Sequence, residues 1–379
     1  MRRLLGRLAL LLGSLAVGLG LAELAVRLVA PQPFITKELR WEEHDVLGFR
    51  LQPDVIVPGE EGGRINNLGL RDADIGPKPD GQRRLLVLGD SFTFGAGVSV
   101  DAAFPARLAA ELAATPAGAA TGGLRVINGG TVGYGTRREL LWLQTFGALV
   151  APDEVLLAFF VGNDFTDNLN MISPRIVDGQ RMAPGDDDEP LWQVRLRIAA
   201  NESHLYRLLR KERIEPVAID HEWRAANNAP AVERGLGRGR MALFARLEAL
   251  EPDEQERQRE AWAVTRAALD DVHAWCREHG AALKVVVIPD ILQVDGEPLR
   301  VVSGRLGIKP ADVHVARPQE LVMGWCAEVG VPALDLLEPF RNRTREAGRS
   351  LHLGWDPHWN AEGHAFAARL LRERLWPDG

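Results

Sequence analysis

The chain has 379 residues, of which 46% are hydrophobic, so it can bury a sizeable core in one large domain with additions or in two domains. Its formal net charge of −7 argues against a nucleic-acid surface, since phosphate binding relies on clustered Lys and Arg. The two cysteines, Cys276 and Cys326, cannot form a disulfide scaffold, and neither has the spacing of a metal ligand. They are expected as buried thiols or as one bridge.

The first 31 residues have the pattern of an export signal. Three arginines precede an uncharged run over residues 8–22. Residues 20–22 fit a cleavage site, whereas the apolar residues that follow them favour an uncleaved membrane anchor. The positive-inside rule keeps the N-terminus in the cytoplasm and sends the rest of the chain to the periplasmic side. Residues 1–31 are therefore predicted to be a signal anchor in the cell membrane, with cleaved secretion as the alternative.

Residues 32–82 are rich in Pro, Gly and Asn and are predicted to form a small β-rich preface. From residue 83 to the end, short apolar runs alternate with helical patterns. Strands are expected at residues 85–88, 124–127, 154–161, 284–288 and 332–336, and helices at about 102–114, 137–149 and 260–278. This alternation predicts an α/β fold with a parallel, doubly wound sheet of about five strands.

A long insertion, at about residues 168–260, separates the third and fourth expected strands. A loop of that length in a compact domain needs a function or structure of its own. We expect helices at 191–209 and 240–250 that form a cap beside the sheet edge. The acidic run at 186–189 fits a mobile surface excursion equally well.

The sequence Gly-Asp-Ser-Phe at residues 89–92 follows the first apolar run directly. In open α/β sheets, ligands bind beyond the carboxyl ends of the strands, so Ser91 stands where chemistry is usually performed. A serine hydroxyl is a weak nucleophile and needs a nearby base, which in turn needs an orienting acceptor. Ser and Asp are also ordinary turn residues, so this motif alone does not establish a nucleophile.

Of the nine histidines, His358 has the most suggestive setting, in Asp-Pro-His-Trp-Asn at residues 356–360. Residues two apart in an extended segment face the same way, so Asp356 can reach Nδ1 of His358 while Nε2 faces Ser91. Asn360 can cap the helix that follows. Alone, the pair would more simply be loop and cap residues.

Two further loops follow the second and third expected strands. One is Asn-Gly-Gly-Thr-Val-Gly-Tyr-Gly at residues 128–135, and the other is Gly-Asn-Asp at 162–164. Acyl transfer develops negative charge on a carbonyl oxygen, which preorganised donors must stabilise. The backbone of Gly133 and the amide of Asn163 can supply such donors at the same sheet edge as Ser91. Each of these residues alone is also common in turns.

These four blocks, in this order, resemble the SGNH or GDSL-type hydrolase superfamily over about residues 83–379. The resemblance implies a flavodoxin-like three-layer α/β/α sandwich. It implies that Ser91 is the nucleophile, His358 the base and Asp356 its partner. The backbone amides of Ser91 and Gly133 and the side chain of Asn163 would form the oxyanion hole.

Many members of the superfamily have Asp three residues before His, where this chain has Trp355. The spacing of two, followed by Trp359 and Asn360, resembles the variant of cell-surface polysaccharide O-acetylation proteins. In those proteins the same groups can pass an acyl group to a sugar hydroxyl. The GxSxG elbow of α/β-hydrolases is absent, because Thr93 occupies its last position.

The sequence therefore predicts a serine esterase that acts on small acyl esters, such as acetyl esters, of carbohydrate or lipid through an acyl-serine. An O-acyltransferase of cell-surface glycan and a non-catalytic glycan-binding assembly protein are the alternatives. No metal, organic cofactor or nucleic-acid partner is expected. The membrane is expected as a partner through the N-terminal helix. A nucleotide-binding domain is disfavoured, because the glycines at 130–135 do not give GxGxxG.

Overall fold

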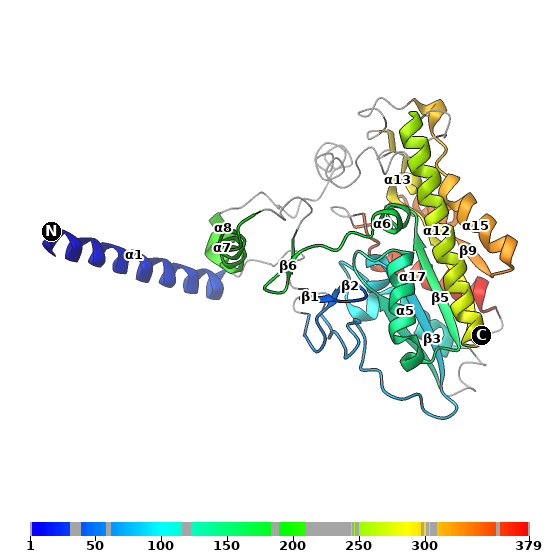
Figure 1. Ribbon diagram of the computed structural model, residues 1–379, viewed down its shortest axis with the longest axis horizontal. Helices are drawn as coiled ribbons and strands as arrows, with labels where there is room; N and C mark the ends of the chain where they lie inside the picture. Colours follow the sequence, from blue (N-terminus) through cyan, green and yellow to red (C-terminus); the bar gives the residue numbers. More distant parts are fainter. Residues whose placement is uncertain are drawn as a thin grey trace. The chain divides into compact units, whose positions relative to one another are not determined.

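The computed structural model of the protein (Figure 1) describes residues 2–30, 39–57, 62–115, 123–182, 189–209, 244, 246, 250–296, 299–300, 303, 309–353 and 357–377. The chain divides into two compact units. The first contains residues 1–42 and 174–218, and the second contains residues 43–173 and 219–379.

The second unit is built on a parallel sheet of five strands. They are β3 (Arg83–Gly89), β4 (Leu124–Gly130), β5 (Glu154–Phe160), β8 (Ala282–Ile288) and β9 (Ala333–Asp335). The spatial order is β4-β3-β5-β8-β9, and every neighbouring pair is parallel. Counted within this sheet, the order is 2-1-3-4-5, which is that of flavodoxin-like folds. The predicted α/β fold with a five-stranded parallel sheet is confirmed.

Helices cover both faces of the sheet. The apolar core on one face joins inward side chains of β3, β5 and β8 to α2 (Ser91–Phe94), α3 (Phe104–Ala113), α16 (Leu337–Ala347) and α17 (Ala361–Leu375). The helices that contact the sheet or one another on the other face are α5 (Thr136–Val150), α6 (Asp164–Asn170), α12 (Pro252–Glu278) and α15 (Arg317–Val329). These layers form the expected three-layer sandwich.

Burial of both sheet faces explains the composition of the strands. Every residue of β5 is buried, including the whole run Val155 to Phe160. A strand covered by helices on both faces needs apolar side chains at every position, not at alternate ones. Shorter elements complete this unit: η1 (Val100–Ala102), α13 (Ile291–Val294) and η3 (Pro310–Asp312).

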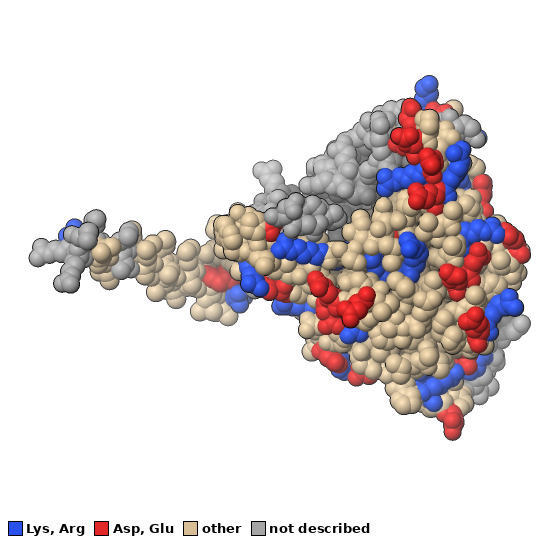
Figure 2. Space-filling view, viewed as in Figure 1, with Lys and Arg blue, Asp and Glu red and all other residues tan. Residues whose placement is uncertain are grey.

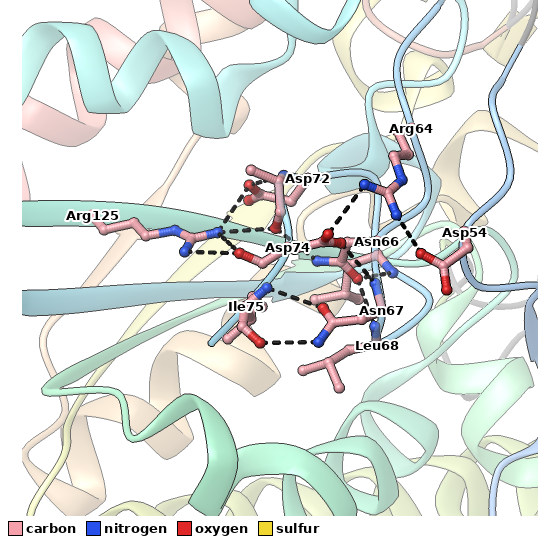
Figure 3. Close-up of polar contacts among 11 residues, drawn as sticks. Asp54, Arg64, Asn66, Asn67, Leu68, Asp72, Asp74, Ile75 and Arg125 are labelled. Atoms are coloured by element: carbon pink, nitrogen blue, oxygen red, sulfur yellow. Dashed lines mark hydrogen bonds and ion pairs between the residues drawn. The ribbon is translucent and has the colours of Figure 1, made fainter. Parts of the chain in front are cut away.

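The predicted preface contains little regular structure. Two short strands, β1 (Trp41–His44) and β2 (Gly48–Leu51), form a two-stranded sheet, and Ile56 and Arg64 form an isolated bridge. Figure 3 shows the loop that follows, in which side-chain amides replace strand pairing. The Asn66 oxygen accepts the N–H groups of Leu68 and Leu70 at 2.9 and 3.0 Å. Such local side-chain bonds are typical of Asn in turns.

This loop is attached to the edge strand of the sheet. Asp72 accepts the backbone N–H of Asn128 at 2.7 Å and lies 3.5 Å from the Arg125 guanidinium. Arg125 also donates to the backbone oxygens of Ala73 and Asp74 (Figure 3). Both Asn128 and Arg125 belong to β4. The preface therefore packs as part of the second unit.

The first unit contains α1 (Arg2–Val29), the antiparallel strands β6 (Ile176–Val177) and β7 (Gln180–Arg181), α7 (Leu191–Glu202) and α8 (His204–Leu209). The helix expected at 191–209 is thus two helices, separated at Ser203. Most of the helix expected at 240–250 and most of the acidic run at 186–189 lie outside the described residues; residues 244, 246 and 250, which are described, are not helical. Within the described chain, one helix is long and apolar enough to cross a membrane, Leu5–Val29, with a mean hydropathy of 2.0.

Charges of both signs are mixed on the described surface. On the face shown in Figure 2, Lys and Arg side chains alternate with Asp and Glu side chains, and the described residues there form no extended basic patch. The middle of α1 is uncharged along its length.

Candidate active site

Ser91 is the first residue of α2, directly beyond the end of β3. Asp90 caps this short helix, because its side chain accepts the Phe92 N–H at 2.9 Å. The helix ends at Gly95, which adopts a left-handed conformation with φ of 81°. Ser91 is 9% exposed, so its hydroxyl lies at the surface of a rigid, buried turn.

The neighbouring strands approach this turn closely because they carry glycine. A Cβ atom on Gly130, at the end of β4, would collide with the backbone of Thr93 and Phe94. A Cβ atom on Gly89 would collide with the Thr93 side chain. The small residues around Ser91 therefore allow two parallel strands and the nucleophile turn to pack together.

His358 reaches Ser91 from the other end of the chain. Its Nε2 atom lies 2.7 Å from Ser91 Oγ, within the reach that a nucleophile and its base require. The two residues are 267 positions apart in sequence. The histidine ring also packs on Phe92, with ring centroids 5.0 Å apart. The structure thus brings together the serine and the histidine that the sequence predicts.

The segment that carries His358 is fixed on both sides. His352 and Trp359 form an antiparallel bridge, and the Leu353 N–H donates to the His358 carbonyl at 2.7 Å. Asn360 caps α17 by accepting the Gly363 N–H at 3.0 Å, as predicted. Trp359 is fully buried, so its ring serves the core.

The predicted acid of the triad, Asp356, lies outside the described residues, as does Trp355. Its role as the partner of His358 stays a prediction.

The predicted oxyanion residues lie beyond the same sheet edge. Gly89 pairs with Gly130 on one side and with Ala158 on the other, so β3 and β4 end together and β5 runs two residues further, to Phe160. Gly133 follows β4 and has φ of 79°, a backbone conformation that residues other than glycine rarely adopt. Asn163 follows β5. Their roles as oxyanion donors stay predictions.

One amide hydrogen of Asn163 is engaged within the protein. Asn163 Nδ2 donates to Asp167 Oδ2 at 3.0 Å, and Asp167 lies one helical turn further along α6. An amide has two N–H groups, so this contact holds the side chain in place and leaves a second hydrogen for another acceptor.

Three buried carboxyl groups lie behind the site, and the sequence did not single them out. Asp90, Glu139 and Asp164 are at most 1% exposed. Burial raises the pKa values of Glu139 and Asp164 well above their usual range, and the charge of the neighbouring carboxyls adds to the effect. Thr136 donates to Asp164 at 3.3 Å. Asp90 directly precedes Ser91 and Asp164 directly follows Asn163, and Glu139 lies close enough to Asp90 for their charges to interact. The position of Glu139 on the buried face of α5 was the sequence signal that could have identified this group.

Two histidines near His358 are buried and structural. Burial lowers the pKa values of His352 and His364 to about 3, so both rings are neutral near pH 7. His364 Nδ1 accepts the Phe104 N–H at 3.2 Å, which joins α17 to α3. The cysteines of the chain are also buried, and both are free thiols whose pKa values burial raises to about 12.

Arg71, from the preface, supports the nucleophile turn from behind. Its guanidinium is buried and donates to the backbone oxygens of Phe94, Gly95 and Val98 at 3.0–3.2 Å. It also lies over the Phe94 ring, 5.0 Å from the centroid. Sequence reasoning missed this residue, because an arginine within a polar, loop-forming stretch carries no signal of burial.

Among the described residues, no group of three or more His, Cys, Asp or Glu side chains is arranged to hold a metal ion. The chemistry available at the site is that of the hydroxyl of Ser91 beside the imidazole of His358.

Similar folds occur in solved structures of low sequence identity. An alpha/beta hydrolase enzyme from the metagenome of Lake Arreo, Spain, is 14% identical, with a TM-score of 0.39 over 78% of this chain and 96% of that one. A member of the lipolytic protein G-D-S-L family from Veillonella parvula is 11% identical, with a TM-score of 0.40 over 77% and 97%. A catalytic mutant of an acetylxylan esterase from Geobacillus stearothermophilus is 14% identical, with a TM-score of 0.37 over 79% and 95%. No protein-family model and no curated protein matches the sequence.

Proposed function

We propose that the protein is a serine esterase of the SGNH or GDSL-type hydrolase superfamily. The observation that carries this proposal is the 2.7 Å separation of Ser91 Oγ and His358 Nε2 at the carboxyl edge of a flavodoxin-like sheet. The motif blocks around Ser91, Gly133, Asn163 and His358 support it, since they follow the order of that superfamily.

The proposed reaction begins with proton transfer from Ser91 to His358. Ser91 Oγ attacks the acyl carbonyl, and its proton passes to Nε2 of the imidazole. The backbone N–H groups of Ser91 and Gly133 and the free amide hydrogen of Asn163 stabilise the oxyanion. Asp356 orients the imidazole and balances its positive charge.

The tetrahedral intermediate then loses its alcohol. The imidazolium of His358 returns the proton to the leaving alkoxide, and the acyl group remains on Ser91 as an ester. A water molecule, deprotonated by the same imidazole, attacks this ester and releases the carboxylic acid. Ser91 recovers its proton, and no other reactant is consumed.

We propose small acyl esters of carbohydrate or lipid, acetyl esters in particular, as substrates. The resemblance to polysaccharide O-acetylation proteins at residues 356–360 favours an acylated glycan and raises transfer to a sugar hydroxyl as a second outcome. Two of the residues behind that resemblance have folding roles here. Trp359 packs in the core and Asn360 caps α17. Hydrolysis therefore stands as the primary proposal.

The proposed location is the cell membrane, with the second unit on the periplasmic side. The supporting observation is the apolar helix Leu5–Val29, none of whose hydrophobic window is buried against the protein. An exposed apolar face of that length is otherwise unfavourable in water.

The test is covalent labelling followed by intact mass measurement. A fluorophosphonate probe should modify the wild-type protein and Ser99→Ala, a matched variant of an exposed serine, but not Ser91→Ala. Incubation with an acetylated oligosaccharide should add one acetyl group transiently to Ser91 and release acetate.

Three results would change the proposal. Labelling that persists in Ser91→Ala would remove the nucleophile assignment. Acetate that appears on an added acceptor sugar in place of water would establish the transferase. Glycan binding without turnover, unchanged in Ser91→Ala, would establish a non-catalytic binding protein.

A further inference from the structure

A single acidic residue interrupts the apolar part of α1, and the insertion binds it. Glu23 Oε2 accepts the Ser203 hydroxyl and the Leu205 N–H, both at 2.7 Å. Glu23 Oε1 accepts the His204 N–H at 2.9 Å. Arg27, one turn further along α1, lies 2.6 Å from the same carboxylate. The start of α8 is therefore bound to the C-terminal part of α1.

These contacts answer a physical requirement. A carboxylate in a helix that is apolar on all sides is unfavourable unless charge and hydrogen-bonding capacity are satisfied. Arg27 supplies the opposite charge. The first N–H groups of α8 supply the donors, because the first N–H groups of any helix have no acceptor within the helix. Ser203 completes the cap, because its hydroxyl oxygen also accepts the Tyr206 N–H at 3.0 Å.

The position of Glu23 along α1 corresponds to a membrane boundary. From Leu5 to Glu23 the helix rises about 27 Å, at about 1.5 Å per residue. The hydrocarbon core of a bilayer is about 30 Å thick. A span that begins at Leu5 thus brings Glu23 to within about 3 Å of the far boundary of the hydrocarbon core, and brings the start of α8 with it.

Helix α7 has two apolar faces, of which one is covered. Val194 and Ile198 pack in a small core with Val177 and Met182 of the β6–β7 hairpin. Trp192 and Leu196 lie four residues apart on another face, and they are 65% and 64% exposed.

Helix α8 also exposes apolar side chains. Tyr206 and Leu209, three residues apart, are 39% and 76% exposed. We refer to these two side chains, together with Trp192 and Leu196, as the α7–α8 apolar face. Trp and Tyr are the residues enriched where a membrane meets water, because one end of each ring is apolar and the other is polar.

We propose that the α7–α8 apolar face inserts into the outer headgroup layer of the membrane, and that Glu23 fastens it to α1. The inference rests on the proposed anchoring of α1 and extends it. It also requires that α1 is retained, because cleavage after Ala22 would make Glu23 a free N-terminus and remove the helix that carries it. The partner is the lipid bilayer, and the insertion supplies a second membrane contact beside the anchor.

The test uses the full chain in vesicles of phosphatidylethanolamine and phosphatidylglycerol, in a Cys276→Ala, Cys326→Ala background. Nitroxide labels at Leu196→Cys and Leu209→Cys should be accessible to oxygen and protected from a water-soluble nickel complex. A label at Leu149→Cys is the matched control, since Leu149 is a leucine of the second unit that is 64% exposed. It should be accessible to nickel.

A label at Leu15→Cys, within α1, separates the two proposals. If it is protected while the Leu196 and Leu209 labels are as accessible to nickel as Leu149, the anchor holds and the α7–α8 proposal is overturned. If the label at Leu15 is accessible to nickel, or if residue 15 is lost by cleavage from the mature protein, both the anchor proposal and the α7–α8 proposal are overturned. Protein dimers in place of lipid contact, shown by label–label broadening at Leu196, would also overturn the assignment.

The role of Glu23 is tested in the same vesicles. Glu23→Leu should leave Leu15 protected but raise nickel access at Leu209 severalfold, because α8 loses its attachment. Glu23→Gln, which keeps an acceptor oxygen, should show a smaller increase. Unchanged access at Leu209 in Glu23→Leu would show that Glu23 does not hold the helix.

Discussion

The ionisable residues of the second unit fall into two regions with opposite properties. At the reactive edge, Ser91 and His358 face one another at 2.7 Å, and His358 is only half-buried. Away from this edge, Glu139 and Asp164 on one face of the sheet and His364 on the other face are fully buried. Burial disfavours charge, so it raises the pKa values of the two acids and lowers that of the histidine.

This difference in burial distinguishes residues that can exchange a proton from residues that only support the structure. A general base must gain and lose a proton during each turnover, which requires access and a partner that moves. Burial shifts a titratable group toward its neutral form, which packs or forms hydrogen bonds. Burial sets His352 and His364 apart from His358, and the contact of His358 with Ser91 makes it the candidate base.

The largest expected effect comes from removing the base at the reactive edge. His358→Ala should lower kcat for a p-nitrophenyl ester by about 10⁴-fold or more, as loss of a catalytic base does in comparable sites. His314→Ala, an exposed histidine paired with Glu320, is the matched control and should retain turnover. Equal losses in the two variants would mean that the Ser91–His358 contact is not the reactive pair.

A smaller effect is expected where the preface supports the reactive edge. Arg71→Met should lower the free energy of unfolding by about 2–4 kcal/mol, because three buried carbonyls around residues 94–98 lose a charged donor. It should also lower kcat, by loosening the Ser91 turn. Chemical denaturation and ester kinetics measure the two effects, and Arg83→Met, an exposed arginine, serves as the control. A stability loss with unchanged kcat would confine Arg71 to folding.

The buried acids should reveal themselves through the pH dependence of stability. Because folding raises the pKa of Glu139, the folded state holds its proton more tightly, and stability falls as pH rises above about 4.5 toward the folded pKa. Each unit of that difference is worth about 1.4 kcal/mol. Glu139→Gln, which mimics the protonated acid, should therefore be more stable than wild type at pH 9 and show little difference at pH 4. A difference that is constant with pH would contradict a protonated Glu139.

The buried histidines should produce the opposite and smallest trend. Folding lowers the pKa of His364 from 6.5 to about 3, so stability is lost as pH falls below about 6.5. His364→Gln keeps an acceptor for the Phe104 N–H and cannot take up the proton. Its stability should decline less between pH 6.5 and pH 4 than that of the wild type, as followed by thermal unfolding. Parallel declines would show that His364 does not carry the acid sensitivity.

The strands of the sheet and the Ser91–His358 pair could be predicted from the sequence, because local patterns of residues indicate them. The apolar runs at 85–88 and 154–161 had to become strands buried on both faces, and glycine and proline marked their ends. Ser91 and His358 were identified because motif order and sheet topology place both at one edge. The break of the 191–209 helix at Ser203 was not predicted; Ser203 caps α8 there and also binds Glu23, about 180 residues away.

By itself, the sequence determined the parallel sheet and the apolar N-terminal helix, because these follow from local periodicity, and the order of its motifs predicted the residues of the site. Only the tertiary structure decided which ionisable groups are available for chemistry. The burial of Arg71 behind Ser91, the raised pKa values of Glu139 and Asp164 and the lowered pKa values of His352 and His364 all follow from tertiary packing. Burial is set by contacts between residues far apart in the chain, so no local pattern encodes it.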